Sequence, residues 1–415
     1  MTEELLRKGT LAKEASFKLA TTSTDDKNNA LKAIARALVE RCDEIIDENS
    51  KDLKNAKEKG MTKAMLDRLT LTPQRIKDMA NGVLQVADLP DPIGEITDNW
   101  TRPNGLEISK KRVPMGVIAI IYEARPNVTV DAAALCLKTS NAVILRGGSE
   151  AINSNVAIMK IMKESAVSSG MPEGCMDILE DTSRETATKL MKMNGYIDLL
   201  IPRGGKGLIK SVVENATVPV IETAAGNCHI YVDKECDFSM ATDVILNAKV
   251  SRPSVCNAME TLLINEEIAN EYLPLIANAL KKEGVEIRGC EKSLSFLPDL
   301  IPATEEDWAT EYNDYILALK IVKDVDEAIS HINKYNTKHS ESIITKNPET
   351  AEKFLSNVDA AAVYHNASTR FTDGFEFGFG AEIGISTQKM HARGPMGLSE
   401  LTSIKYIIKG NGQTR

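Results

Sequence analysis

The chain has 415 residues, of which 43% are hydrophobic and 26% are charged, a composition typical of soluble globular proteins of about two to three domains. Its formal net charge of -9 at pH 7 argues against a nucleic-acid-binding surface, which requires clustered lysine and arginine. The longest apolar run, residues 113–121, is far shorter than the roughly 18 residues of a membrane span.

Targeting signals and metal-binding patterns are not apparent. The first ten residues are charged and lack the apolar core of a secretory signal. Seven cysteines occur without a C-x-x-C pair, and five histidines without H-x-x-x-H spacing. The sequence therefore predicts a cytoplasmic protein with neither a disulfide framework nor a metal site.

The N-terminal region is predicted to be helical. Apolar residues recur at helical spacing over 3–20 and again over 25–59. Thr24 precedes the second stretch and is the expected N-cap, and Gly60 is the expected stop. A further helix is expected after Pro73, before a proline-rich break at 89–95.

Residues 100–112 contain Pro-Asn-Gly between alternating residues, which predicts a β-hairpin. Such a hairpin is either a plain excursion or an arm that pairs with another subunit, since an exposed strand edge favours pairing.

Short apolar segments then alternate with helical ones. Strands are expected at 116–123, 141–147, 175–180, 196–202 and 218–223. This alternation predicts a parallel, doubly wound sheet, in which ligands bind at the carboxyl ends of the strands. A second alternation, from the helix at 238–250 to the strand at 360–366, predicts a second α/β domain.

A glycine-rich turn, Arg203 to Gly207, follows the fourth expected strand and opens a helix. Glycines there let backbone amides approach an anion. The pattern is neither G-x-G-x-x-G nor a Walker loop. An ordinary tight turn is the alternative.

Cys256 stands out among the cysteines. The others lie in apolar, helical or strand patterns, whereas Cys256 lies in a polar loop after Arg252. Cys228 and His229 form a rival nucleophile and base. Because adjacent residues of a strand point to opposite faces, we expect that pair not to cooperate.

Long stretches, among them VPMGVIAIIYEARPNVTVD, SRPSVCNAMETLL and VYHNASTRFTDGFEFGFGAEIGIST, resemble the aldehyde dehydrogenase superfamily. The resemblance implies two Rossmann-like α/β domains and an oligomerisation element. The cofactor domain would cover residues 1–99 and 113–232, and the catalytic domain residues 233–390. Residues 100–112 and 391–415 would form the oligomerisation hairpin and tail, with the contact at Lys405 to Ile408.

The same resemblance implies the catalytic residues. Cys256 would attack an acyl carbon, and the side chain of Asn127 would hold the oxyanion; helix N-capping is the alternative for Asn127. Glu222 matches a general base of hydrolytic members. A phosphate-dependent reductase has no use for water at the thioester, so a structural role for Glu222 stays open.

NADPH is the cofactor that the resemblance implies. Arg146 would bind the 2'-phosphate, and Ser149 stands where NAD-preferring relatives often carry a repelling glutamate. The remaining cofactor residues would be Gly204, Gly205 and Glu311, although Glu311 is nearly as well explained as a surface carboxylate.

Arg370 is the first candidate to hold the substrate's α-carboxylate, Arg125 is the second, and Asn257 would also bind substrate. Because each arginine follows a strand, we expect both loops to face the thiol. Loop packing is the alternative for Arg370.

The implied reaction is reduction of L-glutamyl 5-phosphate by NADPH to L-glutamate 5-semialdehyde through a thioester on Cys256, in L-proline biosynthesis. Homo-oligomerisation and association with glutamate 5-kinase are the implied partnerships. A hydrolytic aldehyde dehydrogenase, which Glu222 would serve, and a non-catalytic oligomeric scaffold are the rival interpretations.

Overall fold

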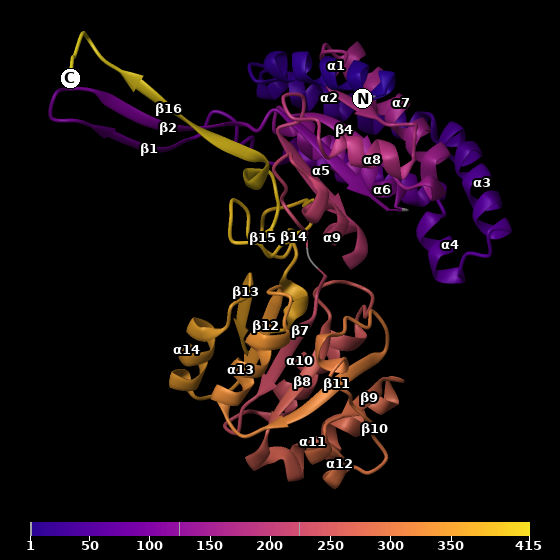
Figure 1. Cartoon of the computed structure of the whole chain (residues 1–415), viewed down its shortest axis with the longest axis vertical. Coiled ribbons are helices and arrows are strands. Elements are labelled where there is room, and N and C mark those ends of the chain that lie inside the picture. Colours follow the sequence, from indigo (N-terminus) through magenta and orange to yellow (C-terminus); the bar gives the residue numbers. More distant parts are fainter. Residues whose placement is uncertain (1, 124, 224) are drawn as a thin grey trace. The chain divides into compact units, whose positions relative to one another are not determined.

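The computed structural model describes residues 2–123, 125–223 and 225–415. They form two compact units. Unit 1 comprises residues 1–223, 378–384 and 396–415, and unit 2 comprises residues 224–377 and 385–395. Figure 1 labels the elements of each.

Unit 1 is built on a parallel sheet with strand order β5-β4-β3-β6. Its strands are β3 (Val117–Tyr122), β4 (Ala142–Arg146), β5 (Met176–Ile178) and β6 (Leu199–Arg203). Strand β3 is buried along its whole length, as expected where helices cover both faces of a parallel sheet. Four of the five expected strands are confirmed.

The fifth expected strand, 218–223, is wrong. Only an isolated bridge joins Val220 to Leu200. The amide of Leu200 donates to the carbonyl of Pro219, but Pro219 has no N–H with which to extend the ladder.

Helices surround the sheet of unit 1. Contacts join α6 and α7 to the strands, α2, α3 and α5 to α6 or α7, and α1 to β3, β4 and β5. The helices are α1 (Glu3–Leu19), α2 (Thr24–Glu40), α3 (Cys42–Glu58), α4 (Lys63–Leu69), α5 (Pro73–Asp88), α6 (Pro126–Lys138), α7 (Ile152–Ser168), α8 (Arg184–Leu190) and α9 (Lys206–Asn215), with a 3-10 turn η1 (Ser149–Ala151).

Two details of the N-terminal helices differ from expectation. The stretch 25–59 is two helices, because Arg41 leaves the helical conformation between α2 and α3. The N-cap of α2 is Ser23, whose hydroxyl accepts the amide of Asp26, and Thr24 is the first helical residue. The stop at Gly60 is confirmed, since its φ of 72° is one that glycine adopts without strain.

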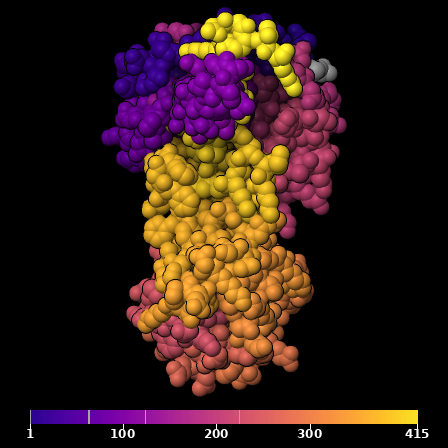
Figure 2. Space-filling model, turned by 90° about the vertical axis from the view of Figure 1, so that its left-hand side faces the viewer, coloured from indigo at the N-terminus to yellow at the C-terminus, as the bar shows by residue number. Residues whose placement is uncertain are grey.

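An antiparallel arm extends from unit 1 (Figure 1). The expected hairpin forms from β1 (Ile96–Thr101) and β2 (Glu107–Pro114), and the C-terminal strand β16 (Thr402–Lys409) pairs with β2. Short 3-10 turn η4 (Ser399–Leu401) precedes β16. In Figure 2 the arm points toward the viewer, with the yellow tail above the violet hairpin.

Unit 2 contains a parallel sheet in the order β10-β9-β11-β8-β7-β12-β13. Its strands are β7 (Cys228–Val232), β8 (Met259–Asn265), β9 (Glu286–Gly289), β10 (Ile301–Pro302), β11 (Ile316–Val322), β12 (Ser340–Ile344) and β13 (Ala362–His365). Strands β14 (Ile385–Ser386) and β15 (Gly394–Pro395) pair separately.

Both faces of the unit 2 sheet are buried. Ile230 of β7 and Leu262 of β8 belong to one apolar cluster, whereas Tyr231 and Leu263 belong to another, as the alternation of side chains along a strand requires. The helices are α10 (Phe238–Val250), α11 (Glu266–Lys282), α12 (Glu291–Phe296), α13 (Val325–Tyr335) and α14 (Pro348–Asn357), with 3-10 turns η2 (Asp307–Ala309) and η3 (Thr369–Phe371). The predicted α/β class is therefore confirmed in both units.

Candidate active site

Cys256 lies in the turn between the end of α10 and the start of β8, and its side chain is half-buried. Gly226 lies two residues before β7, and His339 directly precedes β12. The thiol therefore belongs to the amino edge of the unit 2 sheet. The candidate nucleophile thus lies in a helix-to-strand turn at the amino edge, whereas the general expectation for such sheets is a site at the carboxyl ends.

Two residues fix the backbone of Cys256. The thiol of Cys228 donates to the Cys256 carbonyl at 3.3 Å. The α-carbon of Gly226 approaches so closely that an added Cβ would stand 1.4 Å from the same carbonyl oxygen. A side chain at position 226 would therefore displace the loop that carries the thiol.

Glu311 holds Gly226 in turn. Its Oε1 accepts the amide of Gly226 at 2.7 Å. The carboxylate that the resemblance assigns to a cofactor ribose thus lies beside the backbone that packs on Cys256. Its cofactor role stays a prediction.

Asn257 and Arg370 are brought together in unit 2, although 113 positions separate them. The buried Asn257 amide donates to the carbonyls of Arg370 at 3.1 Å and Thr372 at 3.0 Å. Its Oδ1 accepts from the guanidinium of Arg370, whose Nε donates to the hydroxyl of Ser251 at 3.1 Å. Arg370 therefore spans the Cys256 loop, as the prediction that its loop faces the thiol requires.

The expectation that Cys228 and His229 do not cooperate is confirmed. The Cys228 thiol lies 3.8 Å from Nδ1 of His339, whereas His229 bonds Glu341 at 3.0 Å. Burial raises the pKa of Cys228 well above its usual range and lowers that of His339 to about 4. Cys228 is therefore a protonated thiol that supports the Cys256 backbone.

Sequence reasoning missed a buried ion pair that closes the Cys256 loop. Lys249, near the end of α10, lies 2.5 Å from Glu260, at the start of β8, and neither side chain is exposed to solvent. Burial raises the pKa of Glu260 to about 7, against the opposing effect of the Lys249 ammonium. A glutamate inside the apolar run METLLI was the signal available in the sequence.

In unit 1, Asn127 lies in the first turn of α6. Arg125, not Asn127, occupies the N-cap position, so the N-capping alternative for Asn127 is wrong. The Asn127 amide donates to Asp131 at 3.2 Å, and burial raises the pKa of Asp131 to about 6. Glu222 is half-buried between Ile221 and Thr223, and its role as base or support stays open.

Four of the five expected cofactor residues, Arg146, Ser149, Gly204 and Gly205, lie at the carboxyl edge of the unit 1 sheet, whereas Glu311 belongs to unit 2. The amide of Gly205, at the start of α9, donates to the carboxylate of Glu123 at 3.0 Å, so this helix end already binds an anionic group. Arg146, at the end of β4, donates to the carbonyls of Thr182 and Ser183. Its buried Nε has no partner among the described residues. These groups fit the phosphates of a dinucleotide, and Ser149 is exposed beside them on η1.

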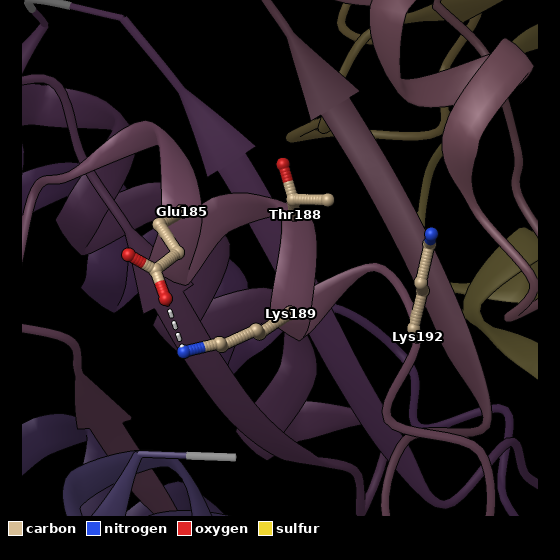
Figure 3. Close-up of a pocket in the computed structure, with 4 residues that line it drawn as sticks. All are labelled: Glu185, Thr188, Lys189 and Lys192. Atoms are coloured by element: carbon tan, nitrogen blue, oxygen red, sulfur yellow. Dashed lines mark hydrogen bonds and ion pairs between the residues drawn. The ribbon is translucent and has the colours of Figure 1, made fainter.

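A surface hollow lies along helix α8 and the turn that follows it. It is lined by Glu185, Thr188, Lys189 and Lys192, and the first and third of these form an ion pair (Figure 3). None of the predicted site residues lines it.

The described residues contain no group of three or more His, Cys, Asp or Glu side chains arranged to hold a metal ion. No helix in the same part of the chain is both long and apolar enough to cross a membrane.

A family model described as "Aldehyde dehydrogenase family" matches residues 3–288 and 308–407. The chain is 66% identical over 415 residues to a gamma-glutamyl phosphate reductase of Clostridium perfringens, with 100% of both chains covered. It is 61% identical over 413 residues to a protein of the same name from Carboxydothermus hydrogenoformans, again with 100% of both covered.

Solved structures agree. The crystal structure of gamma-glutamyl phosphate reductase from Thermotoga maritima matches with a TM-score of 0.98 and 52% identity over 100% of both chains. An acetylating aldehyde dehydrogenase from Geobacillus thermoglucosidasius shares the fold, with a TM-score of 0.71 and 17% identity over 100% of this chain and 98% of that one. The chain therefore belongs to the aldehyde dehydrogenase family, in the branch of the gamma-glutamyl phosphate reductases.

Proposed function

We propose that this protein reduces L-glutamyl 5-phosphate to L-glutamate 5-semialdehyde, with release of phosphate, in proline biosynthesis. The observation that carries the proposal is the 66% identity to a gamma-glutamyl phosphate reductase along the full length of both chains. The loop that holds Cys256 supports it, because the chemistry needs a fixed thiol at an accessible turn.

The Cys256 thiolate attacks the acyl carbon, the bond from that carbon to the phosphate oxygen breaks, and the leaving phosphate takes up a proton. A thioester remains on Cys256. The hydride that reduces the thioester carbon is the chemistry that a nicotinamide cofactor would supply when bound. The resulting oxyanion re-forms its carbonyl, the C–S bond breaks, and the aldehyde leaves with the thiolate restored.

The protein's contribution is to position these groups. Cys228 and Gly226 fix the Cys256 backbone, which aligns the thiol for attack. The Asn127 amide is the proposed oxyanion donor, a kind of contact whose loss typically costs about a hundredfold to a thousandfold in rate. That amide donates one of its two hydrogens to Asp131, so the proposed role falls to the second hydrogen.

NADPH is the proposed cofactor, with Arg146, Ser149, Gly204, Gly205 and Glu311 as the residues that would hold it. Two features support phosphate contacts. The buried Nε of Arg146 bonds none of the described residues, and the start of α9 already accommodates the Glu123 carboxylate. The choice of NADPH over NADH rests on the arginine at position 146 and the absence of a carboxylate at 149.

Homo-oligomerisation through the arm is also proposed. Its strands expose large apolar side chains, a feature typical of interaction surfaces: Ile96, Trp100, Ile404, Tyr406 and Ile408. Association with glutamate 5-kinase is part of the same proposal, because it would limit loss of the labile acyl phosphate.

All seven cysteines are free, which supports a reducing compartment such as the cytoplasm.

The reverse reaction tests the proposal. Glutamate semialdehyde and NADP are supplied with and without inorganic phosphate, and NADPH formation is followed by absorbance. Sustained turnover that depends on phosphate is expected. Equal turnover in water alone would identify a hydrolytic aldehyde dehydrogenase, in which Glu222 activates water. Turnover in neither condition would favour the non-catalytic scaffold.

A further inference from the structure

Arg252 lies in the Cys256 loop and Arg370, on η3, bonds that loop. Neither arginine forms an ion pair with an acidic side chain among the described residues. We propose that they form a phosphate-binding subsite, which takes the phosphoryl group of the acyl phosphate in one direction and inorganic phosphate in the other. This inference rests on the proposed function and names the part of the substrate that these residues meet.

Arg370 is held by neutral partners. Its Nε bonds the Ser251 hydroxyl at 3.1 Å and an Nη1 hydrogen bonds the side-chain oxygen of Asn257. Of the five N–H donors of a guanidinium, three therefore have no partner among the described residues. Asn257 is itself held in place, because the hydroxyl of Thr369 donates to the Asn257 carbonyl at 2.7 Å. The guanidinium is thus fixed while its charge remains available.

Arg252 places a second positive charge beside it. Arg252 is exposed and follows Ser251, the residue that Arg370 bonds. Burial lowers the pKa of Arg370, and the charge of Arg252 lowers it further. Two cations that destabilise one another are stabilised by an anion that binds both.

Asp373 does not pair with Arg370. Its charge acts on Arg370 without an ion pair, after that of Cys256, and its Oδ1 accepts the amides of Phe375 at 2.9 Å and Glu376 at 3.4 Å within its own loop. Among the described residues the two arginines therefore have no carboxylate partner, which leaves that place to an external anion.

Proximity to Cys256 selects the phosphate over the α-carboxylate. Arg370 bonds Asn257, the residue next to the nucleophile. In L-glutamyl 5-phosphate a single oxygen joins the phosphorus to the carbon under attack, whereas the α-carboxylate lies at the far end of the carbon chain. A phosphate dianion also accepts bidentate bonds from guanidinium groups. This assignment replaces the α-carboxylate role expected for Arg370 and leaves Arg125 as the candidate for that group.

Arg252→Gln is the informative variant, because Arg252 is exposed and its side chain bonds none of the residues that the structure describes, so the substitution should not impair folding. Arg36→Gln, at an exposed arginine of α2, is the matched control for loss of one charge. Both are assayed in the reverse direction with phosphate and glutamate semialdehyde varied separately. Loss of charge-assisted bonds worth about 1.5–3 kcal/mol should raise the KM for phosphate by about 10-fold to 100-fold. The KM for semialdehyde should stay within about twofold.

A second measurement does not depend on turnover. Inorganic phosphate should slow alkylation of Cys256 by iodoacetamide in the wild-type protein and in Arg36→Gln, but not in Arg252→Gln. Cys256→Ala identifies the alkylated residue.

The outcomes separate the two proposals. An unchanged KM for phosphate in Arg252→Gln, a raised KM for semialdehyde instead, or equal phosphate protection in all variants would overturn the subsite. A wild-type protein that lacks phosphate-dependent turnover yet is protected by phosphate through Arg252 would overturn the proposed function and retain the subsite.

Discussion

The two sheets carry their candidate functional groups at opposite edges. In unit 1, Arg146 ends β4 and Gly205 follows β6, so both lie at the carboxyl edge. In unit 2, Gly226 and Cys256 precede β7 and β8, at the amino edge. One edge thus offers a helix N-terminus suited to anions, and the other offers a thiol whose backbone is fixed by close packing between two segments.

Replacing the nucleophile gives the largest expected effect. Cys256→Ala should lower kcat by about four to six orders of magnitude, as removal of a catalytic nucleophile does. Cys228→Ala should retain most activity, because its thiol only supports a backbone carbonyl. Steady-state NADPH formation measures both. Retained activity in Cys256→Ala, with loss of activity in Cys228→Ala, would identify Cys228 of β7 as the nucleophile. The contrast drawn between the edges of the two sheets would then be wrong.

Gly226→Ala tests whether the packing of the amino edge controls the thiol. The added Cβ would overlap the Cys256 carbonyl, and displacement of a reacting group by about 1 Å can cost a hundredfold in rate. A fall in kcat of at least about that size is expected, together with a changed rate of Cys256 alkylation.

Gly207→Ala is the matched control for that substitution, since its Cβ would meet nothing within 4 Å and alanine favours a helix. Its thermal midpoint should be unchanged or slightly raised. Wild-type kcat in Gly226→Ala would show that the Cys256 loop moves freely.

Arg146→Ala addresses the carboxyl edge. Loss of a charge-assisted contact to the 2'-phosphate, worth about 1.5–3 kcal/mol, should raise the KM for NADPH by about tenfold or more and leave that for NADH nearly unchanged. Ser149→Glu should act in the same direction by repulsion. Equal catalytic efficiency of the wild-type protein with both cofactors would remove Arg146 from this role.

Asp131→Asn probes the helix that follows β3 and gives the smallest effect. The folded pKa of Asp131 is about 6, against an ordinary 3.8. Between about pH 4 and 6 the folded protein therefore holds a proton that the unfolded chain has released, so the free energy of unfolding contributed by this group falls as pH rises.

The excess stability of the wild-type protein over Asp131→Asn should accordingly decline across that window, by on the order of 1 kcal/mol once solvent screening is allowed for. Urea unfolding at several pH values measures it. Parallel pH profiles of the two proteins would exclude a raised pKa.

The sequence by itself determined most of the local structure. Hydrophobic alternation located both parallel sheets, and the Pro-Asn-Gly turn located the hairpin that β16 joins. It also singled out Cys256, because a thiol in a polar turn departs from the apolar surroundings of the other cysteines. These features depend on neighbours within a few positions, which periodicity and turn chemistry report.

Only the tertiary structure decided which edge carries the thiol and what holds it there. The bond from Arg370 to Asn257 joins residues 113 positions apart, and the contact of Gly226 with Cys256 joins the segment before β7 to the turn before β8. The absence of the strand expected at 218–223 has a similar origin. Pro219 has no N–H with which to extend the pairing beyond the single bridge between Leu200 and Val220. Side-chain to backbone bonds and close backbone packing between distant segments leave no spacing in the sequence, so the chain must fold before they can be identified.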